Sequence, residues 1–167
     1  MTKTHLLDAP QRFVGKTDAY KEFQQKRDNP EWKKAPQDDL INMKTGMFGY
    51  KGGIHYHIAD CINDEIDAID RSLGKNEKTA AVARIIDRHI HKNYKFWAIN
   101  YYFYELLTGD TRFADRYTVE EKAKLDAYLQ GQIEKIDLPD RDDEFCRGKI
   151  LEMYANPVIN YLKAVEE

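Results

Sequence analysis

The most regular pattern of apolar positions lies in the middle of the chain. Ile58, Ile62, Ile66, Ile69 and Leu73 recur at spacings of three and four residues, which is the period of one face of an α-helix. This pattern predicts a helix over residues 54–73, with Gly74 at its carboxyl end.

A second and longer helix is predicted over residues 79–107, because its apolar residues fall on two sides. A helix that is apolar around most of its circumference is packed by neighbours on several sides. We therefore expect this segment to be the long central helix of the fold. One side carries Val82, Ile86, Ile90, Trp97, Tyr101 and Tyr104, and another carries Phe96, Ile99, Phe103 and Leu106.

Capping and turn residues place the remaining helices. The capping box Thr118-Val-Glu-Glu121 predicts a helix over residues 118–136. Asn156-Pro157 is typical of a helix start, which divides the carboxyl-terminal region into two predicted helices. The expected short helices are 17–28, 38–44, 142–155 and 156–165.

The resulting fold class is an all-α, single-domain helical bundle of about five to seven helices with a long central helix. Within one domain, residues 1–53 form an amino-terminal arm with short helices and a glycine-rich loop, and residues 54–167 form the bundle core. The 167-residue length and 42% hydrophobic content suit one globular domain.

Charge and cysteine content narrow the function classes. The net charge of −3 excludes a strongly basic nucleic-acid binder, although a local basic patch is compatible with it. The two cysteines, Cys61 and Cys146, lie far apart, and the first ten residues contain no apolar segment of a signal peptide. We therefore expect free thiols, no membrane span and a cytoplasmic location.

The predicted loop over residues 45–53 carries the candidate partner-binding residues. It contains four glycines, yet Met47, Phe48 and Tyr50 are the side-chain types that interfaces favour. The most economical function is a small intracellular helical binding or regulatory protein. It would act through protein–protein contacts with another protein or with a second copy of itself.

A small helical enzyme is the first alternative. Histidines spaced like His55 and His57 can chelate a metal in an extended segment, and Asp60 and Asp64 follow them at helical spacings. These four residues are the candidate ligands of a divalent metal, and no other cofactor is predicted.

A polar pocket gives this enzyme alternative a second form. His89 would act as acid or base on the central helix, with Glu65 of the preceding helix nearby. Arg84 stands five residues before His89, and this pair resembles the Arg-x4-His element of HEPN-type ribonucleases. The resemblance covers those two residues and implies RNA cleavage at a dimer interface. In that family the arginine holds phosphate and the histidine assists proton transfer.

A nucleic-acid-binding regulator is the second alternative. Basic residues recur on the long predicted helix at spacings of four, four and three, which would form a ridge able to contact phosphates. The competing interpretation is pairing of this ridge with acidic residues on the preceding helix. The ridge consists of Arg84, Arg88, Lys92 and Lys95.

Overall fold

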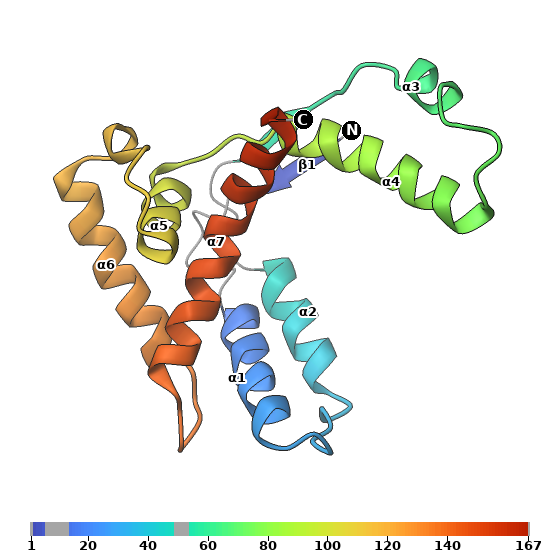
Figure 1. Cartoon of the computed structure of the whole chain (residues 1–167). Helices are drawn as coiled ribbons and strands as arrows, with labels where there is room; N and C mark the ends of the chain where they lie inside the picture. Colours follow the sequence, from blue (N-terminus) through green and yellow to red (C-terminus); the bar gives the residue numbers. More distant parts are fainter. Residues whose placement is uncertain (1, 6–13, 49–53, 167) are drawn as a thin grey trace.

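The computed structural model of the chain describes residues 2–5, 14–48 and 54–166 (Figure 1). Helices dominate these residues and the strands are short, so the predicted all-α class is confirmed. None of the helices in these ranges is long and apolar enough to cross a membrane. The elements are β1 (Thr2–His5), α1 (Val14–Asp28), α2 (Asp38–Phe48), β2 (Ile54–His57), α3 (Asn63–Asp67), α4 (Lys75–Lys92), α5 (Ala98–Thr108), the 3-10 turn η2 (Ala114–Arg116), α6 (Val119–Glu134) and α7 (Asp143–Glu166).

The hydrophobic core lies between α5, α6 and α7, with a contribution from α1. Phe103, Leu129, Ile150 and Tyr154 meet there and are fully buried. The rings of Phe103 and Tyr154 pack edge to face with centroids 5.1 Å apart, a favoured aromatic geometry. The 24-residue α7 runs through this core. The fold therefore has a long central helix, but it is α7 rather than the predicted segment.

Residues 79–107 do not form one helix, so that prediction is wrong in extent. A non-helical segment separates α4 from α5. At the end of α4, Nδ2 of Asn93 donates to the carbonyl of His89 at 2.8 Å. At the start of α5, the backbone N–H of Trp97 donates to Oδ1 of Asn100 at 3.1 Å. Side chains thus satisfy backbone groups on both sides of the break, and the chain can turn there into the core.

Residues 54–73 are also not one helix. Residues 54–57 form β2, which pairs antiparallel with β1, and α3 is short and buries no side chain. Ile58 is 73% exposed, whereas Ile66 and Ile69 line a shallow depression together with α4. The helical spacing of Ile66 and Ile69 thus corresponds to a contact with α4 at the edge of the fold. The strand forms because a distant segment supplies hydrogen bonds that the period does not encode.

The two helices expected on either side of residue 156 are one continuous helix, with Pro157 inside α7. A proline lacks the backbone N–H, so the carbonyl of Met153 loses its helical donor. The neighbouring carbonyl of Tyr154 accepts a hydrogen bond from Nδ2 of Asn100 at 3.0 Å. This contact with α5 supports the turn that the proline weakens.

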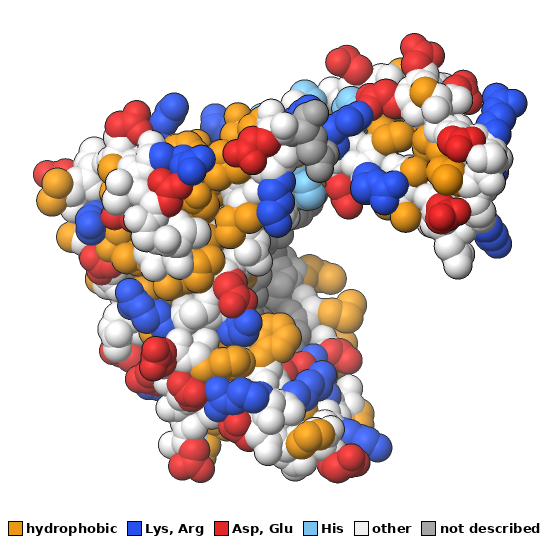
Figure 2. Space-filling model, viewed as in Figure 1, with side chains coloured by type: hydrophobic (Ala, Val, Ile, Leu, Met, Phe, Trp, Pro, Cys, Tyr) orange, Lys and Arg blue, Asp and Glu red, His pale blue; other side chains and the backbone are white. Residues whose placement is uncertain are grey.

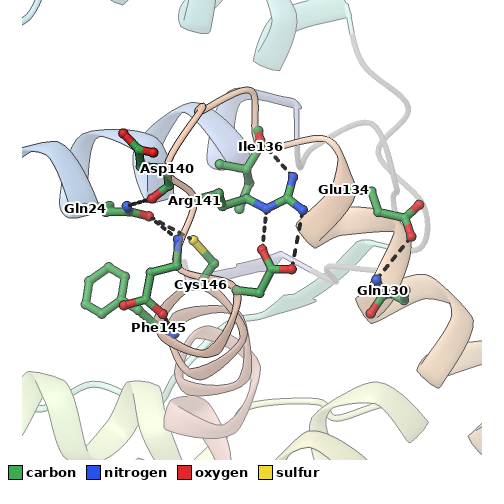
Figure 3. Close-up of polar contacts among 10 residues, drawn as sticks. Gln24, Gln130, Glu134, Ile136, Asp140, Arg141, Phe145 and Cys146 are labelled. Atoms are coloured by element: carbon green, nitrogen blue, oxygen red, sulfur yellow. Dashed lines mark hydrogen bonds and ion pairs between the residues drawn. The ribbon is translucent and has the colours of Figure 1, made fainter.

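Gln24 attaches α1 to the segment that begins α7 (Figure 3). Its side chain is 2% exposed; Nε2 donates to the carbonyl of Asp140 at 2.6 Å, and Oε1 accepts the backbone N–H of Asp142 at 2.9 Å. The thiol of Cys146 lies 3.9 Å from the same Oε1. Cys146 is buried and Cys61 is exposed, and both are free, as expected.

Candidate functional site

The candidate site lies on α2, whose position is fixed by polar contacts with its surroundings. Nζ of Lys34, in the connection before α2, forms ion pairs with Glu22 of α1 at 2.5 Å and with Asp39 of α2 at 2.8 Å. Hydrogen bonds to Asp39 and then Glu22 raise the pKa of Lys34 above its ordinary value. Asp38 accepts the backbone N–H of Ala35 at 3.0 Å. These contacts define where α2 begins and hold it beside α1.

Five large apolar side chains of α2 are exposed, with fractions between 53% for Ile41 and 78% for Phe48. At about 100° of rotation per residue, their positions fall within one arc of roughly 160° on the helix surface. Figure 2 shows hydrophobic side chains on the side of α2 that borders the hollow between α2 and α4. We call this surface the α2 arc, which consists of Leu40, Ile41, Met43, Met47 and Phe48.

The polarity of α2 is the reverse of that of a helix packed on a core. Asp38 and Gly46, on the side opposite the α2 arc, are half-buried, while the arc itself is in solvent. Lys44 lies within the arc, is exposed and forms no ion pair with any described residue. A contiguous apolar patch with this exposure is typical of an interaction surface.

Two of the three predicted partner-binding residues lie on this surface. Met47 and Phe48 are 68% and 78% exposed, but they belong to the last turn of α2 rather than to a loop. The predicted loop over residues 45–53 therefore begins too early, because the apolar spacing of α2 continues past Gly46. Tyr50 lies outside the described residues.

Sequence reasoning missed the other members of the α2 arc. Leu40, Met43 and Met47 are separated by three and four residues, the spacing of one helix face. That period was available in the sequence. The helix predicted over residues 38–44 ends within this series, so the prediction divides these residues between two elements.

The predicted catalytic candidates are brought together only in part. Nε2 of His89 lies 2.5 Å from Oε1 of Glu65, and Arg88 forms an ion pair with the other carboxylate oxygen. The hydrogen bond with His89, followed by the charges of His89 and Arg88, lowers the pKa of Glu65. Both oxygens of Glu65 are engaged, so this cluster joins α3 to α4.

Arg84 does not join that cluster in the described part of the chain. Residues five apart on a helix point about 140° away from each other, which separates Arg84 from His89. Arg84 instead lines a depression with Arg88 of α4 and Lys163 of α7. Arg88, and not Arg84, shares the partner Glu65 with His89. The structure therefore does not bring together Arg84 and His89, the two residues that resemble the ribonuclease element.

The four predicted metal-ligand residues fall on separate surfaces. His55 and His57 are half-buried on β2 and line a cleft beside the end of α4. Asp60 and Asp64 are exposed and do not line that cleft. Among residues 2–5, 14–48 and 54–166, no three His, Cys, Asp or Glu side chains are grouped so that they could hold one metal ion.

The predicted basic ridge is divided between two surfaces. Arg84 and Arg88 border the depression that includes Lys163, whereas Lys92 and Lys95 line the cleft that includes the histidines of β2. Lys95 lies beyond the end of α4, so the break before α5 turns it away from the helical row. The described acidic partner of this set is Glu65, which pairs with Arg88.

Comparison with known proteins found no matching family model, no matching curated protein and no matching solved structure.

Proposed function

We propose that this chain is a binding protein that docks another protein through the α2 arc. The observation that carries the proposal is the reversed polarity of α2, which presents its large apolar side chains to solvent. An amphipathic helix of this type fits into an apolar groove of its partner, with contacts at positions three, four and seven residues apart. Met43 and Met47 suit such a contact because their unbranched side chains adapt to the shape of a groove.

The charge in the arc specifies the partner further. Lys44 stands among the apolar residues and has no ion-pair partner in the described chain. Burying an ammonium group without an opposite charge is costly, so we expect the groove to offer a carboxylate within reach of Lys44. The proposed partner is thus a protein whose apolar groove contains at least one acidic residue. A partner whose groove is lined with basic residues is disfavoured.

Site-specific photo-crosslinking tests this function. A benzophenone amino acid replaces Met47 in one variant and Val119 in the control. Val119 is an isolated residue of α6 with 80% exposure. We expect a protein that crosslinks from position 47 and not from position 119, and the purified partner must then bind the unmodified chain directly. If both positions give the same crosslinks, the proposal is wrong.

A substitution series then measures the contribution of the arc. Met43→Ser, Met47→Ser and Phe48→Ser together should weaken partner binding at least ten-fold, since apolar anchors dominate interface energies. Lys44→Glu should also weaken binding to the acidic groove. Sedimentation of the purified chain tests whether the α2 arc binds a second copy of the chain instead. If the chain forms concentration-dependent dimers and the serine variant does not, the partner is a second copy and not another protein.

A further inference from the structure

A second surface with a different chemistry lies at the opposite end of α7 from Gln24. The ends of α4 and α7, the start of α5, β2 and the 3-10 turn enclose a cleft of about 570 Å³. Sites for small ligands commonly have volumes of roughly 300–1,000 Å³. The cleft includes no residue of the α2 arc, so the two surfaces are separate.

One wall of the cleft is aromatic. The ring centroid of Phe96 lies 5.7 Å from that of Tyr101 and 5.4 Å from that of Tyr161, and Tyr101 lies 5.0 Å from Phe113. Tyr94 extends the row, 6.0 Å from Phe96. All five rings are half-buried, so their neighbours fix them while part of each faces the cleft. The rings are inclined to one another by between 45° and 73°, so a flat ring would stack on one of them rather than on the whole row.

The rim of the cleft is cationic. Lys92 and Lys95 are exposed and form no ion pair with a described residue, and Arg116 pairs with Asp115 at 3.6 Å. No Asp or Glu is among the described residues that line the cleft. Burial raises the pKa of Tyr94 and of Tyr101, so their phenols are neutral and add no negative charge at pH 7. The rim therefore favours anions.

We propose that this cleft binds a nucleotide unit of a single-stranded nucleic acid. The base stacks on the aromatic wall, and the phosphates lie against Lys92, Lys95 and Arg116. Stacking surfaces beside cationic rims are how proteins bind single strands without reading their sequence. A strand is favoured over a free nucleotide because a neighbouring depression between α4 and α7 adds the cations Arg84, Arg88 and Lys163 against the single acidic residue Asp87 among its described lining residues. A duplex does not fit because its bases are already stacked.

Fluorescence anisotropy with a labelled twelve-nucleotide oligouridine tests the proposal on the full chain. The double substitution Lys92→Ala and Lys95→Ala should weaken binding about ten-fold or more. It should also reduce the slope of log K against log salt by about 1.4, since each phosphate contact contributes roughly 0.7 for single strands. The matched control removes two exposed lysines of the α6 region, Lys124→Ala and Lys135→Ala, and should leave binding unchanged.

A second variant separates stacking from charge. Tyr161→Leu keeps apolar bulk but removes the ring, and we expect about ten-fold weaker binding. A melting curve is recorded for each variant. If Tyr161→Leu unfolds the chain, the proposal is tested by the binding affinity of the Lys92→Ala and Lys95→Ala double variant alone.

Competition identifies the source of the nucleotide unit. Unlabelled oligouridine should displace the probe at micromolar concentration, while uridine monophosphate and the matching duplex should require far more. Equal competition by the mononucleotide would reassign the cleft to a free nucleotide. The proposal is overturned if the oligonucleotide does not bind at 50 mM salt, if the lysine control loses as much affinity, or if the duplex binds as well as the single strand.

Discussion

Gln24 and Asp142 lie 118 positions apart in the sequence, yet Oε1 of Gln24 accepts the backbone N–H of Asp142 at 2.9 Å. The other end of the same amide donates to the carbonyl of Asp140 at 2.6 Å. One buried side chain therefore satisfies two backbone groups of the turn before α7. The joint places α1 on the core, and α2 is held beside α1 in turn.

We expect Gln24→Ala to lower the free energy of unfolding by about 2 kcal/mol, because two backbone groups lose the hydrogen bonds that the buried Gln24 amide makes with them. Urea denaturation measures this loss. Gln130→Ala is the matched control, since Gln130 is exposed and its side chain donates to the exposed Glu134 in the same helix. It should change the stability by less than about 0.5 kcal/mol. Equal effects of the two substitutions would show that the joint contributes nothing.

Asn100 is expected to be the most sensitive polar residue of α5. It is 7% exposed and bonds to the backbone of Trp97 and of Tyr154. Asn100→Ala removes both bonds and should lower the free energy of unfolding by about 2–3 kcal/mol. Asn76→Ala makes the same change at an exposed site of α4 and should be nearly neutral. A neutral Asn100→Ala would mean that α7 passes through its proline without this support.

The core and its edge should respond differently to truncation of an aromatic residue. Phe103 is fully buried, so Phe103→Ala should cost about 4 kcal/mol. Trp97 is half-buried against the same cluster, and Trp97→Ala should cost less, about 2 kcal/mol. Chemical denaturation of both variants gives the order. The reverse order would place the centre of the core at the start of α5.

Acid should release α3 from α4. The pKa of Glu65 is lowered by the hydrogen bond with His89 and by the nearby charges. A carboxylate with a lowered pKa stabilises the folded contact above its ordinary pKa of about 4.3, and that stabilisation is lost as the pH falls through the lowered value. Backbone amide chemical shifts of residues 63–67, followed by NMR from pH 6 downward, should report the release.

Glu65→Gln tests whether protonation of Glu65 causes the release of α3. Asp64→Asn, which changes the neighbouring carboxylate, is the control. The glutamine variant should show the released shifts of α3 already at pH 6, with little change in the melting temperature, because α3 and α4 bury no side chain. The asparagine variant should titrate like the unmodified chain. A large fall in melting temperature for Glu65→Gln would contradict the peripheral position of α3.

The sequence by itself determined the features that depend on neighbours within one or two helical turns. Thr118 accepts the backbone N–H of Glu121 at 3.1 Å, and Glu121 accepts that of Thr118 at 2.8 Å, so the predicted capping box does begin α6. Gly109 ends α5 with a φ of 75°, a backbone conformation that favours glycine. The all-α class follows from the same short-range periods.

Only the tertiary structure decided the features that need a distant partner. Strand β2 forms where a helical period continued, because β1 lies opposite it. Helix α7 continues through Pro157, because α5 packs against it and Asn100 reaches its backbone. The candidate site shows the same division. The apolar spacing of Met43 and Met47 is written in the sequence, but a period does not say which face of a helix meets its neighbour. The polar contacts of Lys34 with α1 and α2 hold that helix with its apolar face in solvent.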